Sequence, residues 1–166
     1  IFKISRIHLF NLIKIDILFN IFYCFKFTFM KRILVLCTGN SCRSQMAEGF
    51  LKLLGLNVQS AGIESHGINK YAVQVMCELN IDISNNKSKS IESLNLDDFN
   101  LLITVCDHAK ENCPNINFIK DKIHKSFIDP ANFKGSNETK LAIYRKVRDE
   151  IKLFCDQINL SFHGKK

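Results

Sequence analysis

The residues best suited to chemistry lie between Cys37 and Ser44, in the string CTGNSCRS. Cys37 follows an apolar run at residues 33–36, Arg43 stands six positions after it, and a helical pattern comes next. In a strand, loop and helix of this kind, backbone N–H groups and the positive end of the helix attract a tetrahedral oxyanion. Arg43 can bind two of its oxygens at once, and the same field favours the thiolate form of Cys37.

This spacing predicts that Cys37 is a nucleophile in an anion-binding loop. Ser44 can donate a hydrogen bond to the sulfur, and Gly39 permits a backbone angle that other residues resist. The alternative is that Cys37 is a small buried residue at a strand end, as many free cysteines are. The predicted anion-binding residues are Thr38, Gly39, Asn40, Ser41, Cys42, Arg43 and Ser44.

The strands and helices that position these residues can be predicted from apolar runs, which alternate along the chain with segments of helical periodicity. These runs and segments predict an α/β fold, a four-stranded parallel sheet with helices on both faces. Strands are expected at residues 32–37, 56–60, 101–105 and 123–128, and the longest helix at 137–160. Sites in such sheets form beyond the carboxyl ends of the strands. Three candidates each end a different predicted strand and should therefore meet at one edge: Cys37, Cys106 and Asp129.

Cys106 and Cys113 stand seven positions apart. On an intact helix that spacing separates them by about 10 Å, so a disulfide between them requires the segment to loop or unwind. Two other interpretations stay open. The first is a zinc site formed with His108, for which a fourth ligand is missing, and the second is two unrelated thiols.

The composition indicates one soluble globular domain with an anionic substrate. The chain has 166 residues, 46% of them hydrophobic, and a net charge of +7. Its lysines and arginines are not clustered with aromatic residues, so no nucleic-acid partner is expected. Seven cysteines among plentiful apolar residues favour reactive thiols in a cytoplasmic protein over a disulfide scaffold. Cys77 is expected in or at the boundary of the core, and Cys155 in its packing.

Residues 1–29 differ from the rest, because they hold half of the 14 phenylalanines and no Gly, Pro, Ala or Val. We expect a non-native or disordered extension there, with a single catalytic domain at residues 30–166 beginning at Met30. The alternative is a signal or membrane segment. Against it, polar residues interrupt the apolar run before it is long enough to span a bilayer, so no membrane association is expected: Lys14, Asp16, Asn20 and Lys26.

The loop from Cys37 to Ser44 resembles the active-site loop of the low-molecular-weight protein tyrosine phosphatases. The longer string CTGNSCRSQMAEG is similar to that of the thioredoxin-coupled arsenate reductases, which are built on the same fold. In those reductases one cysteine follows a buried strand, and another, before a proline, ends an acidic, Asn-rich segment. Cys106 and Cys113 match these two positions, which a simple phosphatase of this fold does not need.

The resemblance implies that arsenate is reduced to arsenite. Cys37 would attack arsenic held by Arg43 and the loop, and Asp129 would handle the proton of the departing oxygen. Cys106 would then form a disulfide with Cys37, and Cys113 would move that disulfide outward for thioredoxin to reduce. Phosphate and sulfate would compete as oxyanions, and the protein would act as a monomer. A protein tyrosine phosphatase and a non-enzymatic oxyanion or redox sensor are the alternatives.

Some relatives bind potassium near this loop through an Asn, a Glu, a Ser and an Asp. The first three match Asn40, Glu48 and Ser60, but the fourth falls at Lys89. A positive charge there disfavours the ion, so we expect no metal and no tightly bound cofactor. The ammonium of Lys89 would either take the place of the cation beside Glu48 or point into solvent.

Overall fold

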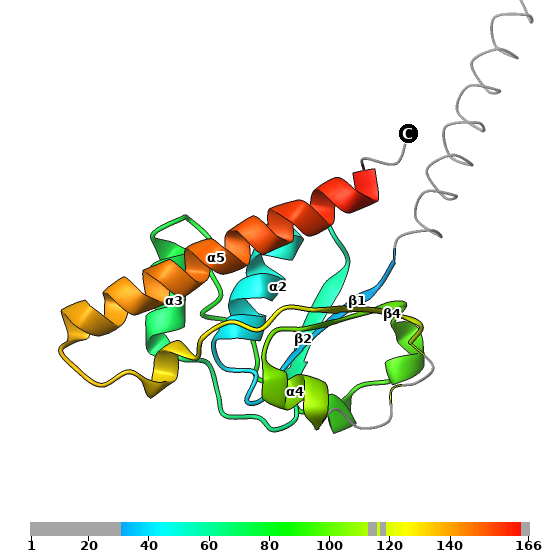
Figure 1. Ribbon diagram of the computed structural model, residues 1–166, viewed down its shortest axis with the longest axis horizontal. Helices are drawn as coiled ribbons and strands as arrows, with labels where there is room; N and C mark the ends of the chain where they lie inside the picture. The colour runs from blue at the N-terminus through cyan, green and yellow to red at the C-terminus, as the bar shows by residue number, and fades with distance from the viewer. Residues whose placement is uncertain (1–30, 113–115, 117–118, 164–166) are drawn as a thin grey trace, which may run out of the picture. The chain divides into compact units, whose positions relative to one another are not determined.

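The computed structural model describes residues 31–112, 116 and 119–163. Within them, four strands form one parallel sheet in the order β2-β1-β3-β4 (Figure 1). Their bounds are Ile33–Cys37 for β1, Val58–Gly62 for β2, Leu101–Thr104 for β3 and Asp121–His124 for β4. Every residue of β1 and β3 is buried, as expected for strands covered on both faces. The predicted parallel α/β fold is confirmed.

Four α-helices accompany this sheet in the described part of the chain. They are α2 (Arg43–Leu53), α3 (Lys70–Cys77), α4 (Asp107–Glu111) and α5 (Asn137–His163). α2 packs against β1 and β2, and α5 packs against α2 and α3 (Figure 1). The short helix α4 contacts β1 and β3, so it lies close to the loop that follows β1. None of the helices in the described part of the chain is long and apolar enough to cross a lipid bilayer.

The last strand differs from its prediction. β4 ends at His124, so the expectation that a strand runs to residue 128 is wrong, although the N–H groups of Lys125 and Phe127 still donate to the carbonyls of Thr104 and Val105. β4 is an edge strand paired only with β3, and Phe127 beyond it is buried, with its ring 5.7 Å from that of Phe154 on α5. The segment after β4 therefore contacts both the sheet, through its backbone, and α5, through the ring of Phe127. Asp129 begins the turn Pro130–Asn132 instead of ending a strand.

The two helical cysteines outside the predicted site behave differently. Cys155 on α5 is fully buried, as predicted. Cys77 is exposed, so its predicted place in or at the boundary of the core is wrong. α3 buries Ala72, Val75 and Met76 and ends at Cys77, which faces away from them. The predictions for residues 1–29 and for Cys113 fall outside the described residues and stay predictions.

Candidate active site

The loop between β1 and α2 surrounds the sulfur of Cys37 with hydrogen-bond donors. The backbone N–H of Asn40 donates to Cys37 Sγ at 3.2 Å, and Ser44 Oγ lies 2.9 Å from the same sulfur. Hydrogen bonds of this kind stabilise a thiolate. Cys37 is only 2% exposed, and α2 begins at Arg43 directly after the loop. The sulfur thus lies at the closed end of a loop built to hold negative charge.

The side chain of Asn40 holds this loop in shape. Its backbone is left-handed with φ 45°, a conformation that asparagine tolerates better than most residues. Its Nδ2 donates to Ser44 Oγ at 2.9 Å and to Ser60 Oγ at 2.8 Å. Its Oδ1 accepts from Gln45 Nε2 at 3.0 Å and from the backbone N–H of Lys89 at 2.8 Å. The loop is therefore preorganised by contacts that reach β2 and the segment before residue 90.

Gly39 is required for a different reason from the one expected. It is not among the described residues with positive φ. A Cβ at this position would lie 2.4 Å from Nδ1 of His66, so the imidazole packs directly on the glycine backbone. Gly39 thus allows the close approach of His66, whose Nε2 is 2.7 Å from the carboxylate of Glu64. Nothing in the local sequence pattern predicts this contact.

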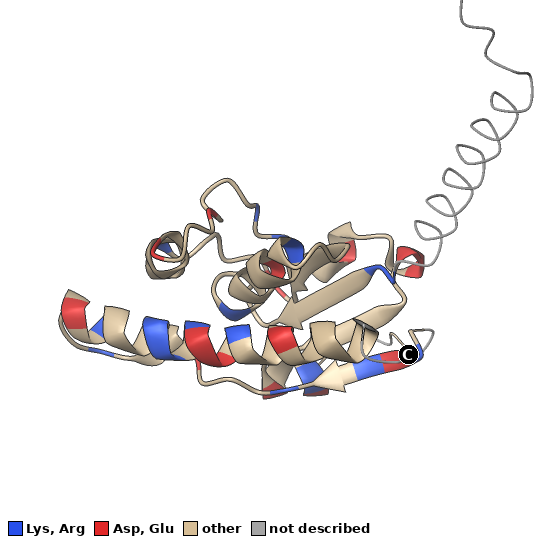
Figure 2. Cartoon of the chain, turned by 90° about the horizontal axis from the view of Figure 1, so that it is seen from above, with Lys and Arg blue, Asp and Glu red and all other residues tan. Residues whose placement is uncertain are grey.

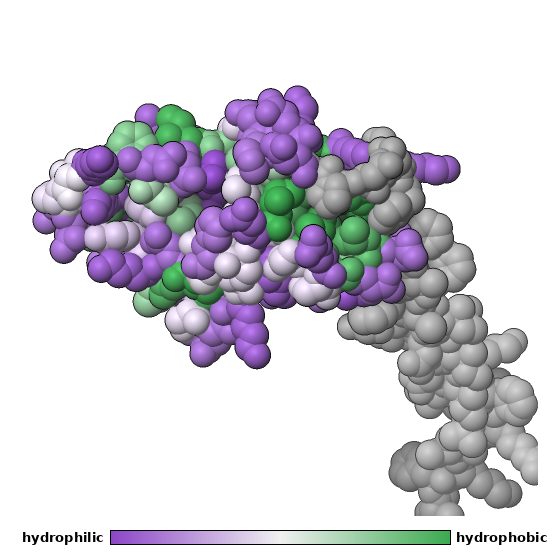
Figure 3. Space-filling view, turned by 90° about the horizontal axis from the view of Figure 1, so that it is seen from below, coloured by the Kyte–Doolittle hydropathy of each residue, from purple (hydrophilic) through white to green (hydrophobic). Residues whose placement is uncertain are grey.

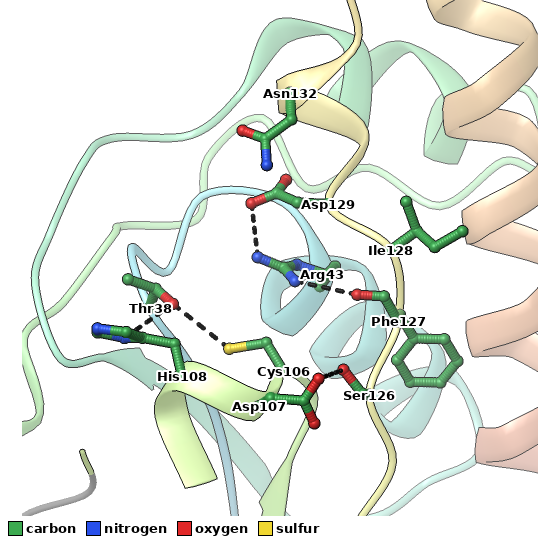
Figure 4. Close-up of a pocket in the computed structure, with 10 residues that line it drawn as sticks. All are labelled: Thr38, Arg43, Cys106, Asp107, His108, Ser126, Phe127, Ile128, Asp129 and Asn132. Carbon is green, nitrogen blue, oxygen red and sulfur yellow. Dashed lines mark hydrogen bonds and ion pairs between the residues drawn. The ribbon is translucent and has the colours of Figure 1, made fainter. Parts of the chain in front are cut away.

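Arg43 joins the loop to the segment beyond β4 (Figure 4). Its Nη1 donates to the carbonyl of Phe127 at 3.0 Å, and its Nη2 donates to Asp129 Oδ2 at 2.6 Å. The side chain of Arg43 is 10% exposed and that of Asp129 is 31% exposed, so the pair is partly shielded from water. Asp129 consequently reaches the catalytic edge even though it does not end a strand.

Cys106 approaches the same loop from the other side. Its sulfur accepts a hydrogen bond from the N–H of Ala109 at 3.4 Å and lies 3.4 Å from Thr38 Oγ1 (Figure 4). Thr38 follows Cys37 directly, so one hydroxyl connects the nucleophile loop to the second cysteine. Cys106 is buried, and its position caps the first turn of α4.

Two adjoining cavities contain these groups. The first has a volume of about 320 Å³ and is lined by Cys37, Thr38, Gly39, Ser41, Cys42, Arg43, His66, Asp129, Ala131 and Asn132. The second, of about 580 Å³, shares four of these residues and extends to Cys106, Asp107 and His108 (Figure 4). The structure therefore gathers Cys37, Arg43, Cys106 and Asp129 around one hollow. Cys113 lies outside the described residues.

The chain matches the model of the low molecular weight phosphotyrosine protein phosphatase family over residues 32–165. It belongs to that family. A protein of Halalkalibacterium halodurans named arsenate reductase is 50% identical over 124 residues, which are 73% of this chain and 89% of the relative.

Two solved structures of arsenate reductases share the fold. One, in the phosphate-binding state, is 33% identical with a TM-score of 0.65. The other, in the oxidised state, is 32% identical with a TM-score of 0.67. Each match covers 80% of this chain and 98% of the other.

Within this phosphatase fold, Cys42 is a loop residue held as a neutral thiol. Burial raises its pKa to about 11, and its sulfur lies 3.6 Å from the hydroxyl of Tyr144 on α5. Burial also raises the pKa of the Tyr144 hydroxyl. Both groups are therefore uncharged at neutral pH, which suits packing behind the anion loop. Sequence patterns did not reveal Tyr144 as a neighbour of the site, since it appears only as one apolar position of a long helix.

The potassium site suggested by the family pattern does not fit the contacts observed. Glu48 is buried, with one carboxylate oxygen paired to the ammonium of Lys52 and the other accepting from the N–H and hydroxyl of Ser60. Asn40 Oδ1 already accepts two N–H groups, one of them from the backbone of Lys89. The ammonium beside Glu48 is thus that of Lys52, an (i,i+4) partner on α2, so the first of the two alternatives for Lys89, an ammonium in the place of the cation, is wrong.

Proposed function

We propose that this protein reduces arsenate to arsenite through Cys37, Cys106 and Cys113, and that thioredoxin reduces the final disulfide. The contact between Thr38 and Cys106 supports this proposal most directly, because it brings a second thiol to the nucleophile loop. Hydrolysis of a phosphate ester needs one thiol, whereas reduction of arsenate takes two electrons and therefore two thiols. The 50% identity to a protein named arsenate reductase points the same way.

In the first step the oxyanion enters beside Cys37, and Arg43 binds its oxygens through guanidinium N–H groups other than those that donate to Phe127 and Asp129. Cys37 Sγ attacks arsenic, a sulfur–arsenic bond forms and an arsenic–oxygen bond breaks. The departing oxygen leaves as water. Asp129, which accepts a hydrogen bond from Arg43, is in a position to supply the proton that this oxygen needs. The N–H of Asn40 and the hydroxyl of Ser44 contact the attacking sulfur and hold it in place.

In the second step the thiolate of Cys106 attacks Cys37 Sγ. A disulfide forms and the sulfur–arsenic bond breaks, with its electron pair staying on arsenic, which leaves as arsenite. Cys113 then attacks Cys106 and restores the Cys37 thiolate, so the disulfide moves outward. The segment between the two cysteines must loop or unwind for this exchange, and α4 within it is weakly anchored, because Ala109 is its one buried residue within Asp107–Glu111. Such chemistry requires a reducing compartment, which supports a cytoplasmic enzyme. We further propose that it acts as a monomer.

Phosphotyrosine hydrolysis is the second candidate, because the family and the loop are those of phosphatases. The walls of the anion cavity argue against it as the main activity. No Phe or Tyr is among the described residues that line the smaller cavity around Cys37, so no aromatic ring stacks on a phosphotyrosine ring there, and Phe127 lines only the larger cavity. We expect only slow hydrolysis of simple aryl phosphates.

The deciding experiment is arsenate-dependent oxidation of NADPH with thioredoxin and thioredoxin reductase present. Cys106→Ser and Cys113→Ser should each abolish multiple turnover with arsenate and leave slow aryl phosphate hydrolysis, whereas Cys37→Ser should abolish both. Cys77→Ser is the matched control, because it removes an exposed thiol outside the site. Full arsenate turnover by Cys113→Ser would refute the relay.

A further inference from the structure

The imidazole of His108 lies at the end of a short hydrogen-bonded chain that leads to Cys106. His108 Nδ1 is 3.4 Å from Thr38 Oγ1, and the same hydroxyl is 3.4 Å from Cys106 Sγ (Figure 4). His108 is exposed, whereas Cys106 is buried. We propose that His108 is a positioning residue that activates the Cys106 thiol through the hydroxyl of Thr38. The proposal rests on the function above, in which Cys106 is the second nucleophile.

A threonine hydroxyl suits this bridge because it can accept one hydrogen bond and donate another. Thr38 accepts the S–H of Cys106 while its own O–H points to the unprotonated Nδ1 of His108. One proton then moves from sulfur to the hydroxyl oxygen as the hydroxyl proton moves to Nδ1. The result is a thiolate at Cys106 and an imidazolium at His108, with no atom or electron gained or lost. Imidazole is the side chain whose ordinary pKa allows this exchange near neutral pH.

The other charged groups around the cavity already have partners of their own. Arg43 is paired with Asp129 across the cavity. Asp107 accepts from Ser126 Oγ at 2.7 Å and lies 3.2 Å from His124 Nε2 on β4. The titratable residues that line the two cavities from the loops are Cys37, Cys42, Arg43, His66 with its partner Glu64, and Asp129. Those on the neighbouring elements are Asp107, Lys110 and Glu111 of α4 and Asp121, Lys122 and His124 of β4.

The proposal separates the two chemical steps. Attack of Cys37 on an oxyanion does not involve Cys106, so loss of His108 should leave aryl phosphate hydrolysis unchanged. Attack of Cys106 on Cys37 needs the Cys106 thiolate, so the same change should lower kcat for arsenate and leave KM unchanged. A purely structural role in α4 would not produce this separation together with a pH dependence.

The test measures the alkylation rate of Cys106 in the full-length reduced protein by iodoacetamide, read peptide by peptide, with phosphate present to protect Cys37. His108→Gln keeps a polar side chain but cannot accept the proton. At about pH 6.5 to 7, iodoacetamide should alkylate Cys106 about tenfold more slowly in His108→Gln than in the unmodified protein, the order expected when a thiol loses its charge partner. The difference should vanish at about pH 10, where a thiol ionises without help.

Thr38 offers a matched pair of variants. Thr38→Ser keeps the hydroxyl and should keep the Cys106 alkylation rate at neutral pH, whereas Thr38→Val should lower it as His108→Gln does. The double change of Thr38→Val and His108→Gln should be no slower than either single change, because both break the same bridge. Additive losses would show that the two residues act separately and would overturn the proposal.

Two results would contradict the role of His108 itself. Equal Cys106 alkylation in His108→Gln and the unmodified protein at every pH would show that no bridge operates. An equal loss at every pH would indicate a general disturbance of α4. Because alkylation is measured without arsenate, a chain that failed to reduce arsenate yet showed the expected pH dependence would refute the proposed function and leave the bridge standing.

Discussion

At the scale of single residues, Arg43 connects the anion loop to the segment that contains Phe127 and Asp129. Its planar fork binds the carbonyl of Phe127 and the carboxylate of Asp129 while its own position in α2 faces the anion loop. A lysine can place a positive charge there, but it cannot supply two parallel N–H donors. The guanidinium geometry, beyond its charge, is therefore what the site uses.

Arg43→Lys should weaken oxyanion binding at least about tenfold, because a charge-assisted hydrogen bond contributes about 1.5–3 kcal/mol. The measurement is the sulfate concentration that protects Cys37 from alkylation. Arg145→Lys is the control, since Arg145 pairs with Glu78 on the surface, between α5 and the end of α3. Protection of Arg43→Lys at the same sulfate concentration as the unmodified protein would contradict the assigned role.

A second prediction concerns the buried thiols. Burial raises the pKa of Cys155 from 9.0 to about 12 and that of Cys42 from 9.0 to about 11. Above pH 9.0 the unfolded chain therefore loses thiol protons that the folded chain retains, so the free energy of unfolding falls as pH rises. Each such thiol contributes a slope of about 1.4 kcal/mol per pH unit within its window.

Urea denaturation at about pH 8, 9, 10 and 11 measures this slope. Cys155→Ala should be less stable at every pH, because it leaves a small cavity, but its decline above pH 9.0 should be shallower. Cys77→Ala removes an exposed thiol and serves as the control. The same slope in Cys155→Ala and the unmodified protein would show that Cys155 ionises equally in both states.

At the scale of elements, α4 depends on its ties to β4. Helices this short are not stable by themselves. Asp107 in its first turn accepts from Ser126 Oγ and pairs with His124, whose Nδ1 is 2.8 Å from Thr104 Oγ1 on β3. The hydrogen bond from Ser126 lowers the pKa of Asp107. The ionised carboxylate therefore stabilises α4 at pH values above 3.8, the ordinary pKa of an aspartate. This stabilisation is lost as the pH falls through the lowered pKa of Asp107 in the folded protein.

Asp107→Asn should loosen α4 and speed tryptic cleavage after Lys110 about two- to fivefold, the loss expected for one or two exposed hydrogen bonds. Limited proteolysis at neutral pH followed by mass spectrometry provides the rate. Asp82→Asn is the control, because Asp82 is exposed and its carboxylate accepts from the N–H of Ser84, far along the chain from α4. If Asp107→Asn is cut no faster than the control, the ties to β4 do not hold the helix.

At the scale of the whole molecule, positive and negative side chains are mixed over the surface. Figure 2 shows Lys and Arg alternating with Asp and Glu along α5. On the face in Figure 3, hydrophobic residues form small separate areas between hydrophilic ones. The net charge of +7 therefore acts as a general attraction for anions, which salt screens, while Arg43 supplies the specific contact.

The pairing of Glu48 with Lys52 gives a prediction about cations. Because Lys52 already neutralises Glu48, arsenate turnover should change less than about twofold when potassium is exchanged for a large organic cation at constant ionic strength. Constant ionic strength removes the screening of the net charge from the comparison. Strong activation by potassium but not by the organic cation would reveal a functional site despite Lys52.

The sequence by itself determined the anion loop and the strands that carry it. From Cys37 to Ser44 the key contacts are local, with Asn40 and Ser44 bonding to the sulfur within a few residues. The apolar runs that became β1 and β3 are equally explicit, because strands buried on both faces require continuous apolar residues. The pair of Glu48 with Lys52, four residues later on α2, is also local, although the sequence led us to consider only Lys89.

Only the tertiary structure decided how distant segments meet. Phe127 packs on Phe154 beyond the end of β4, and Asp129, two residues further on, pairs with Arg43. The bridge from Thr38 to Cys106 and His108 likewise joins the ends of β1 and β3. These contacts depend on where loops turn and on which side chains fill the core. Those outcomes come from packing over the whole domain, and no local pattern of residues specifies them.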